Sequence, residues 1–258
     1  MFERSSLMTS AVVLAFVVSG TAAATPTAEE PLAGTVVFLD PGHQGSSAGE
    51  NLSRQVDDGR GGTKDCQTTG MTALGGTPEH TIVWNVTQLV RSSLESLGAT
   101  VVLSRPDDDG WGGCITDRAA AASASGAAVA VSIHADSTST AGTPDSADHG
   151  FHIIVPTLPV PSSEVNSVQS GAGRVASTAM RDSYLREGFP PSNYAGVDGI
   201  QERSDIAAPA LTTVPVVFVE MGNGSDPGDA AILESADGQL SHAIAIGAGI
   251  IDFVLHDE

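Results

Sequence analysis

Three apolar segments of this chain each end on a residue that can bind a metal ion or act beside one. These segments cover residues 35–43, 129–134 and 214–220, and their last residues are His43, His134 and Glu220. Short apolar runs rich in β-branched residues are typical of buried strands in a parallel or mixed sheet. Because open α/β sheets bind ligands just beyond the carboxyl ends of their strands, we expect these polar side chains to share one site.

Between these segments the hydrophobic pattern alternates between strands and helices. Helices are predicted over about 79–97, after Thr116 and over 165–186, and a further helix opens at Asp226 and either continues or restarts before Leu255. Further strands are predicted over 99–104 and 151–155. This alternation predicts a single α/β domain, with a twisted mixed, largely parallel sheet flanked by helices on both faces. We divide the chain into a signal peptide (1–24), a linker (25–33) and a catalytic domain (34–256).

The signal peptide is inferred from an apolar stretch over residues 11–18 that is followed by Ala22, Ala23 and Ala24. The stretch is too short to span a membrane comfortably, and small residues suit signal-peptidase cleavage. A retained anchor is the alternative. No later segment is expected to cross a membrane, so the mature protein is predicted to be secreted, in the periplasm or the cell-wall space.

The net charge limits the possible binding partners of the chain, and its cysteine content indicates a disulfide. The formal net charge is −20, which argues against nucleic acid or an anionic membrane surface as a partner. The chain has two cysteines, Cys66 and Cys114, and an isolated pair in an exported protein favours a disulfide. No apolar stripe calls for a dimer, so we expect a monomer.

Catalytic zinc sites use three protein ligands and leave one position open for water. His43 and His134 follow predicted strands, and the carboxylate of Glu79, at the start of the first long helix, is the candidate third ligand. The alternative for Glu79 is that it only complements the helix dipole. His80 is its immediate neighbour, but adjacent residues on a helix point in different directions.

The sequence resembles the zinc-dependent N-acetylmuramoyl-L-alanine amidases of the amidase-3 family. The resemblance rests on short motifs in order along the chain: Asp40-Pro41-Gly42-His43, Glu79 with Asn85, Arg118 to Ala122 followed by Ser132-Ile133-His134-Ala135, and Pro215 to Glu220. It implies that His43, Glu79 and His134 bind Zn²⁺ and that Glu220 is the catalytic carboxylate. The implied reaction cleaves the amide bond between N-acetylmuramic acid and L-alanine, in peptidoglycan or in muropeptides.

Two positions depart from the family pattern. Many relatives have Glu where this chain has His152. His152 either replaces a polar residue of the site wall or only forms part of a strand, and we favour the second interpretation. The basic segment of relatives is replaced by residues 198–201, and Arg203 nearby is a candidate to bind a carboxylate of the stem peptide. Asn85 is a second candidate substrate-binding residue.

Two other functions are considered. Residues 45–49 fit the Gly-x-Ser-x-Gly pattern of serine hydrolases, which would make Ser47 the nucleophile of an esterase. The chain could also be a peptidoglycan-binding protein without activity. The polar segment over residues 45–77 is too long for an ordinary connection, and we expect it to form a flap or inserted hairpin that shapes the substrate cleft.

Overall fold

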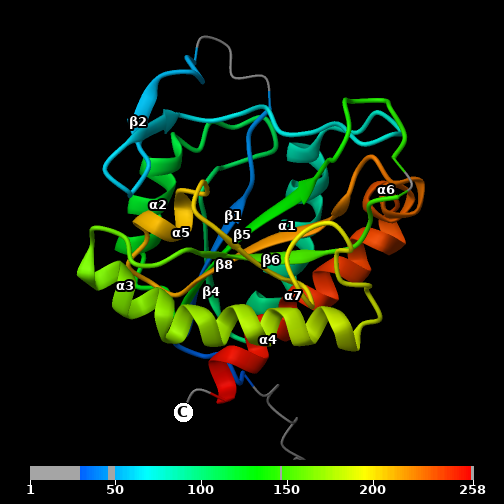
Figure 1. The fold of residues 1–258 in the computed structure, drawn as a ribbon. Helices are drawn as coiled ribbons and strands as arrows, with labels where there is room; N and C mark the ends of the chain where they lie inside the picture. The colour runs from blue at the N-terminus through cyan, green and yellow to red at the C-terminus, as the bar shows by residue number, and fades with distance from the viewer. Residues whose placement is uncertain (1–29, 46–49, 146, 257–258) are drawn as a thin grey trace, which may run out of the picture.

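The computed structural model describes residues 30–45, 50–145 and 147–256 (Figure 1). The predicted signal peptide, most of the linker and Ser47 lie outside these residues. The described chain forms the expected α/β domain, built on a six-stranded sheet of order β4-β1-β5-β8-β6-β7. The predicted fold class is therefore confirmed.

Four strands of this sheet are parallel, and a pair at one edge runs the other way. The parallel strands are β4 (Thr100–Leu103), β1 (Val36–Pro41), β5 (Val129–Asp136) and β8 (Val216–Asn223). The reversed pair consists of β6 (His152–Pro156), which is antiparallel to β8, and β7 (Ile200–Arg203), which is parallel to β6. The carboxyl ends of β1, β5 and β8 therefore lie side by side at one edge, beside the start of β6.

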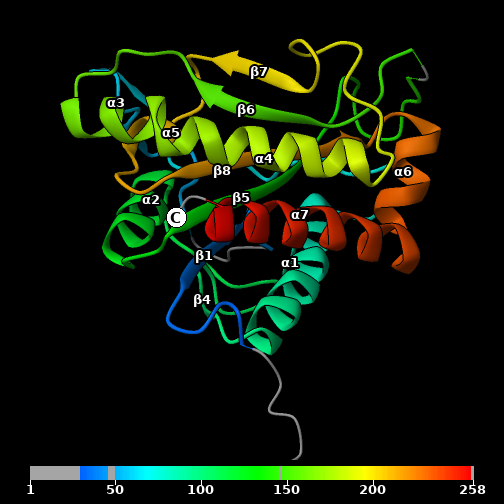
Figure 2. The same ribbon diagram turned by 90° about the horizontal axis from the view of Figure 1, so that it is seen from below.

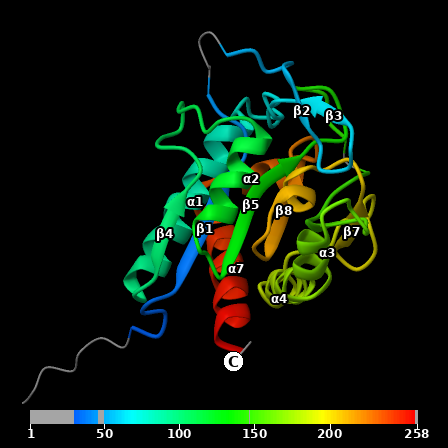
Figure 3. The same cartoon turned by 90° about the vertical axis from the view of Figure 1, so that its left-hand side faces the viewer.

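Helices cover both faces of the sheet (Figures 2 and 3). The large core lies under α1 (Glu79–Ser96), α4 (Ala172–Arg186) and α7 (Ala236–His256), where apolar side chains from these helices pack on one face of the central strands. A smaller core around Phe38 lies on the other face, near α2 (Ile115–Ala124) and α5 (Ala208–Leu211). Residues of β1, β5 and β8 alternate between these cores, which fixes the face on which their polar ends emerge.

Two predicted helical regions are interrupted. The region over 165–186 breaks at Gly171 into α3 (Ser163–Ser170) and α4, and the region after Asp226 divides into α6 (Pro227–Glu234) and α7. Asp226 caps α6, because its side chain accepts hydrogen bonds from the backbone N–H groups of Gly228 and Asp229. A cap followed by Pro227 at the first turn is the signal by which the sequence marked this start.

The expectation that no later segment could cross a membrane is corrected for one helix. Ala236–Leu255 in α7 is long and apolar enough by length and composition, with a mean hydropathy of 1.4. Its apolar residues have a different explanation in the fold, because Ala245, Ile246 and Ile250 are fully buried in the large core between α1 and α4. A core helix shielded on several sides is expected to be this apolar.

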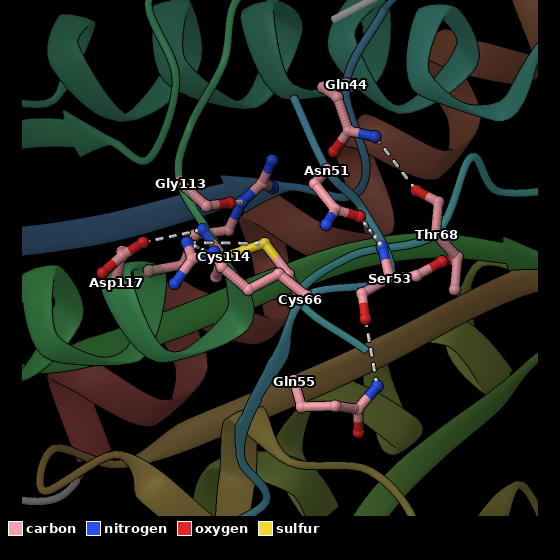
Figure 4. Close-up of a disulfide and its surroundings, with 11 residues drawn as sticks. Gln44, Asn51, Ser53, Gln55, Cys66, Thr68, Gly113, Cys114 and Asp117 are labelled. Carbon is pink, nitrogen blue, oxygen red and sulfur yellow. Dashed lines mark hydrogen bonds between the residues drawn. A yellow bond between two sulfur atoms is a disulfide. The ribbon is translucent and has the colours of Figure 1, made fainter. Parts of the chain in front are cut away.

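The long polar segment after β1 contains the expected hairpin, formed by β2 (Gln55–Asp57) and β3 (Thr63–Asp65). The predicted disulfide joins Cys66, directly after this hairpin, to Cys114, which caps α2 (Figure 4). The backbone N–H of Ile115 also donates to the carbonyl of Cys66. The hairpin is thus tied covalently and by hydrogen bonds to the start of α2.

Candidate metal centre

Three predicted ligands meet at the edge where the parallel strands end. His43 follows β1, Glu79 is the first residue of α1, and His134 lies near the end of β5. One donor atom from each lies within 4.8 Å of the other two. His43 Nε2 is 3.1 Å from Glu79 Oε2, and His134 Nδ1 is 3.1 Å from Glu79 Oε1. Two imidazoles and one carboxylate converging in this way form a donor set suited to zinc.

Each of the three side chains is held by a second contact. His43 Nδ1 lies 3.1 Å from the carbonyl of Thr68, to which it can only donate, so Nε2 is left free to bind a metal. The two oxygens of Glu79 accept hydrogen bonds from the backbone N–H groups of Met71 and Ala135. The ring of His134 stacks on Phe218, with ring centroids 4.4 Å apart.

Glu79 is 3 % exposed, and its surroundings determine its charge. Burial on its own would raise the pKa of this carboxyl group. The imidazoles of His43 and His134, through their charge and their hydrogen bonds, outweigh burial and hold the pKa well below its usual range. The carboxylate is therefore ionised, as a metal ligand must be.

At two positions, Gly42 and Gly70, the backbone lies so close to the predicted ligands that a side chain would collide with them. A Cβ atom added to Gly42 would lie 2.3 Å from Cε1 of the His134 ring, and one added to Gly70 would lie 2.6 Å from Oε2 of Glu79. His43 itself has a φ of 60°, an unusual value for a residue with a side chain. Backbone strain of this kind persists where the surrounding structure requires it, often at functional sites.

A buried ion pair fixes the turn that carries His43. Asp40 accepts hydrogen bonds from Arg118 Nη1 at 2.9 Å and from the hydroxyls of Ser104 and Ser132. Arg118 also donates to the carbonyls of Pro41 and His43. Burial raises the pKa of Asp40, but the Arg118 guanidinium and the two hydroxyls lower it to about 2. The turn is thus built around a permanent charge pair.

His80 takes no part in this centre. Its Nδ1 lies 2.8 Å from Oδ1 of Asp108, and the carbonyl of His80 accepts a hydrogen bond from Arg105. The sequence argument that adjacent helical residues point apart therefore holds for Glu79 and His80.

Glu220 lies beside the three ligands in register with His134. The two residues are direct partners in the parallel β5–β8 pair, so their side chains share one face of the sheet. Glu220 is 8 % exposed, and its Oε2 is buried without a hydrogen-bond partner among the described residues. Burial, followed by the charges of Asp136 and Glu79, raises the pKa of Glu220 well above its usual value, whereas Arg203 opposes this shift.

These residues line one cavity of about 520 Å³. Its walls include all three ligands and Glu220, together with Lys64, Thr68 and Gly70 from the long segment after β1. This segment therefore shapes the cleft, as the sequence led us to expect. A volume of this size suits a small-molecule or peptide ligand.

The two candidate substrate-binding residues lie in different places. Arg203 lines the cavity and forms a two-point ion pair with Asp205, with Nε 2.8 Å from Oδ1. Asn85 is exposed on α1 and is not part of the cavity lining. The structure thus brings Arg203 to the metal centre and leaves Asn85 outside it.

Two residues around the site, Thr68 and Asp136, were not among the residues predicted from the sequence. Thr68 contacts His43 Nδ1 through both its backbone carbonyl and its hydroxyl, and its place in a polar segment gave no indication of this role. Asp136 accepts a hydrogen bond from the hydroxyl of Tyr194, 58 residues further along the chain, and only the fold brings them together. Asp136 directly follows the Ser-Ile-His-Ala motif, and its position two residues beyond His134 could have suggested it.

Comparison with known proteins identifies the family. Residues 37–252 match the Amidase_3 family model, described as N-acetylmuramoyl-L-alanine amidase. The chain belongs to this amidase family. It is 38 % identical over 243 residues to the N-acetylmuramoyl-L-alanine amidase Rv3717 of Mycobacterium tuberculosis, across 94 % of this chain and 95 % of that protein.

Solved structures support membership of the amidase family. The crystal structure of the amidase Ami1 from Mycobacterium smegmatis is 39 % identical, with a TM-score of 0.79, and the match covers 87 % of this chain and 99 % of that one. AmiC2 of Nostoc punctiforme shares the fold at 21 % identity, with a TM-score of 0.62 and coverage of 86 % and 97 %. The family assignment agrees with the resemblance that the motifs indicated.

Proposed function

We propose that this chain is an exported, zinc-dependent amidase that hydrolyses the bond between N-acetylmuramic acid and L-alanine in peptidoglycan or its fragments. The observation that carries the proposal is the arrangement of His43, Glu79 and His134 in one cavity with the buried carboxylate of Glu220, whose Oε2 has no hydrogen-bond partner among the described residues. Membership of the amidase family and the 38 % identity to Rv3717 support the choice of substrate.

His43, Glu79 and His134 would hold the metal through Nε2, a carboxylate oxygen and Nδ1 respectively. The donors fit zinc because the carboxylate is ionised and the other nitrogen of His43 is committed to Thr68. A bound zinc ion would polarise the amide carbonyl and make a water molecule a stronger nucleophile.

Glu220 would carry the proton. Its pKa is raised above that of an ordinary carboxyl group, chiefly by burial, which favours a group that can accept a proton and release it again. As general base it takes a proton from the attacking water, and as general acid it gives that proton to the departing nitrogen of L-alanine. An amide nitrogen leaves poorly unless it is protonated, so this second transfer is required.

The stem peptide would pass along the part of the cavity wall that carries Arg203 and Lys64. Arg203 and Lys64 bring positive charge to the cavity lining of a chain whose net charge is −20. The carboxylates of a stem peptide are complementary to these cations. Because Asp205 already pairs with Arg203, the substrate carboxylate would share or replace that contact.

The test is digestion of purified muropeptides followed by mass spectrometry. We expect products that carry a free N-terminal L-alanine, no such products after chelation, and recovery of activity when zinc is restored. Release of products that is insensitive to chelators would contradict the metal-dependent reaction.

The two alternatives give different results in the same assay. A serine esterase would lose activity in Ser47→Ala and keep it after chelation. A peptidoglycan-binding protein would bind muropeptides and release no new amines. We expect Ser47→Ala to leave amidase activity unchanged.

A further inference from the structure

His152 lies directly beside Glu220 on the neighbouring strand. The two residues are register partners in the antiparallel β6–β8 pair, whose side chains point to the same face of a sheet. The next pair, Ile153 and Val219, points into the large core on the opposite face. Alternation along both strands therefore places His152 and Glu220 side by side on the same face of the sheet.

Both side chains have buried polar atoms without partners among the described residues. His152 is fully buried, and neither Nδ1 nor Nε2 makes a hydrogen bond. Oε2 of Glu220 is likewise buried and unpaired. Buried polar groups in folded proteins are nearly always hydrogen-bonded, so two unpaired groups on adjacent strands require an explanation.

The neighbours that could otherwise pair with His152 are already engaged. The ring of Tyr194 meets the imidazole edge-on, with centroids 5.8 Å apart, while its hydroxyl donates to Asp136. Arg203 is bound to Asp205. Asp136, which is also close, already accepts a hydrogen bond on each oxygen, from Tyr194 and from the backbone N–H of Ser137. Oε2 of Glu220 has no partner among the described residues, so it is the favoured acceptor.

The protonation state of His152 suits a donor. Burial lowers the pKa of its imidazole to about 4, although the charge of Asp136 opposes this shift. A neutral imidazole carries one N–H and can donate it to a carboxylate without adding charge to the site. Oε2 of Glu220 would accept this hydrogen bond, which leaves Oε1 as the oxygen that faces the reaction.

We propose that His152 is a positioning residue that donates a hydrogen bond to Oε2 of Glu220 in the zinc-loaded, substrate-bound protein and so aims the other carboxylate oxygen at the attacking water. Such contacts are often long or unmade until substrate is bound, and then shorten. This inference rests on the proposed function of Glu220. It assigns a role to a residue for which the sequence favoured a place in a strand and no function.

The kinetic test compares two substitutions at the same position in the zinc-loaded protein. His152→Leu removes the donor, and we expect kcat on a purified muropeptide to fall about 10²-fold, as a misplaced reacting group does, with KM and bound zinc unchanged. His152→Gln keeps an N–H donor and should recover most of the lost kcat. Equal loss in both variants, or unchanged kcat in His152→Leu, would overturn the proposal.

His242 provides the matched control. It is also buried, its Nδ1 has no hydrogen-bond partner in the described part of the chain, and burial lowers its pKa to about 3. It lies in a different cavity, against Phe189. His242→Leu should therefore lower stability about as much as His152→Leu while leaving kcat unchanged. Matching losses of kcat in the two Leu variants would show a general packing effect and contradict the positioning role.

A second measurement does not depend on activity. In zinc-loaded protein with a bound muropeptide, nitrogen NMR signals of the His152 ring should change in Glu220→Gln and stay unchanged in Glu234→Gln, a carboxylate that instead binds the backbone near Gly75. Unchanged His152 ring signals in Glu220→Gln would contradict the proposed contact between His152 and Glu220. If the wild-type protein binds muropeptides without cleaving them, the proposed function fails, and this spectrum still decides whether His152 contacts Glu220.

Discussion

The candidate metal centre and the neighbouring Glu220 region differ in how firmly contacts hold their side chains. Each proposed metal ligand is held by a second contact: Thr68 holds His43, backbone N–H groups hold Glu79, and Phe218 stacks on His134. On the next strands, by contrast, Glu220 and His152 have buried polar atoms without partners among the described residues.

This difference matches the different tasks proposed for the two regions. A ligand set works best when its geometry is fixed before the metal arrives, because ordering it later costs free energy. A general acid–base must change its protonation state during each turnover, and a carboxylate locked by permanent hydrogen bonds would stay ionised. We therefore expect substitutions at the proposed metal ligands to reduce activity through weaker metal binding. Substitutions in the Glu220 region should instead reduce activity through impaired proton transfer.

The largest expected effect is the loss of a ligand. His134→Ala should abolish both activity and stoichiometric zinc binding, since a two-ligand site binds the metal far more weakly. Metal content by mass spectrometry and kcat on a muropeptide check this prediction. His80→Ala is the control, because His80 pairs with Asp108 and should leave zinc content unchanged. Full zinc occupancy in His134→Ala would contradict the assignment.

The next effect is indirect and acts on a ligand's position. A Cβ at Gly42 would lie 2.3 Å from the His134 ring, so Gly42→Ala must displace that imidazole. We expect zinc affinity or activity to fall about 10–100-fold, as when residues that support a metal ligand are changed. Gly247→Ala is the matched control, because a Cβ there would meet no atom within 4 Å. Equal zinc affinities in the two variants would show that the ring is not held as rigidly as we describe.

A smaller effect concerns stability at low pH. The pKa of Asp40 is lowered from 3.8 to about 2 in the folded protein, so its ion pair with Arg118 stabilises the fold fully above pH 4. That stabilisation, about 2 kcal/mol, is lost as the pH falls from 4 to 2 and the carboxylate is protonated. Denaturant unfolding at several pH values should show a correspondingly smaller change over this range in Asp40→Asn. An identical pH dependence in both proteins would count against the lowered pKa.

The smallest effect is expected at Asn85. This residue is exposed on α1 and outside the cavity lining, so Asn85→Ala should change neither kcat nor KM. Arg203→Ala is the informative counterpart and should raise KM for muropeptides that carry stem-peptide carboxylates. A raised KM in Asn85→Ala would contradict this prediction and show that Asn85 contributes to substrate binding.

The sequence predicted the parallel part of the sheet because its strands are buried on both faces. The segments that end at His134 and Glu220 are continuous apolar runs, and β5 and β8 follow them closely. The strand β7 was not predicted, since its four residues, Ile-Gln-Glu-Arg, lie at the sheet edge and lack an apolar pattern. Short polar edge strands depend on pairing that local sequence does not reveal.

The candidate site was likewise only partly predictable from the sequence. Motifs and strand ends indicated which residues converge, and the model brings His43, Glu79, His134 and Glu220 together. The place of His152 beside Glu220 depends on the antiparallel pairing of β6 with β8, which connects residues 68 positions apart. Hydrophobic periodicity identifies a strand, but it does not identify the neighbour of that strand.

Glu220→Gln tests the central claim most directly, because the change keeps the size of the side chain and removes its ability to carry a proton. We predict that zinc content stays at the wild-type level while kcat on a purified muropeptide falls about 10²–10⁴-fold, the range for a lost general acid–base. Wild-type kcat in this variant would contradict the role of Glu220 as proton carrier. Loss of zinc would contradict the division between the two regions.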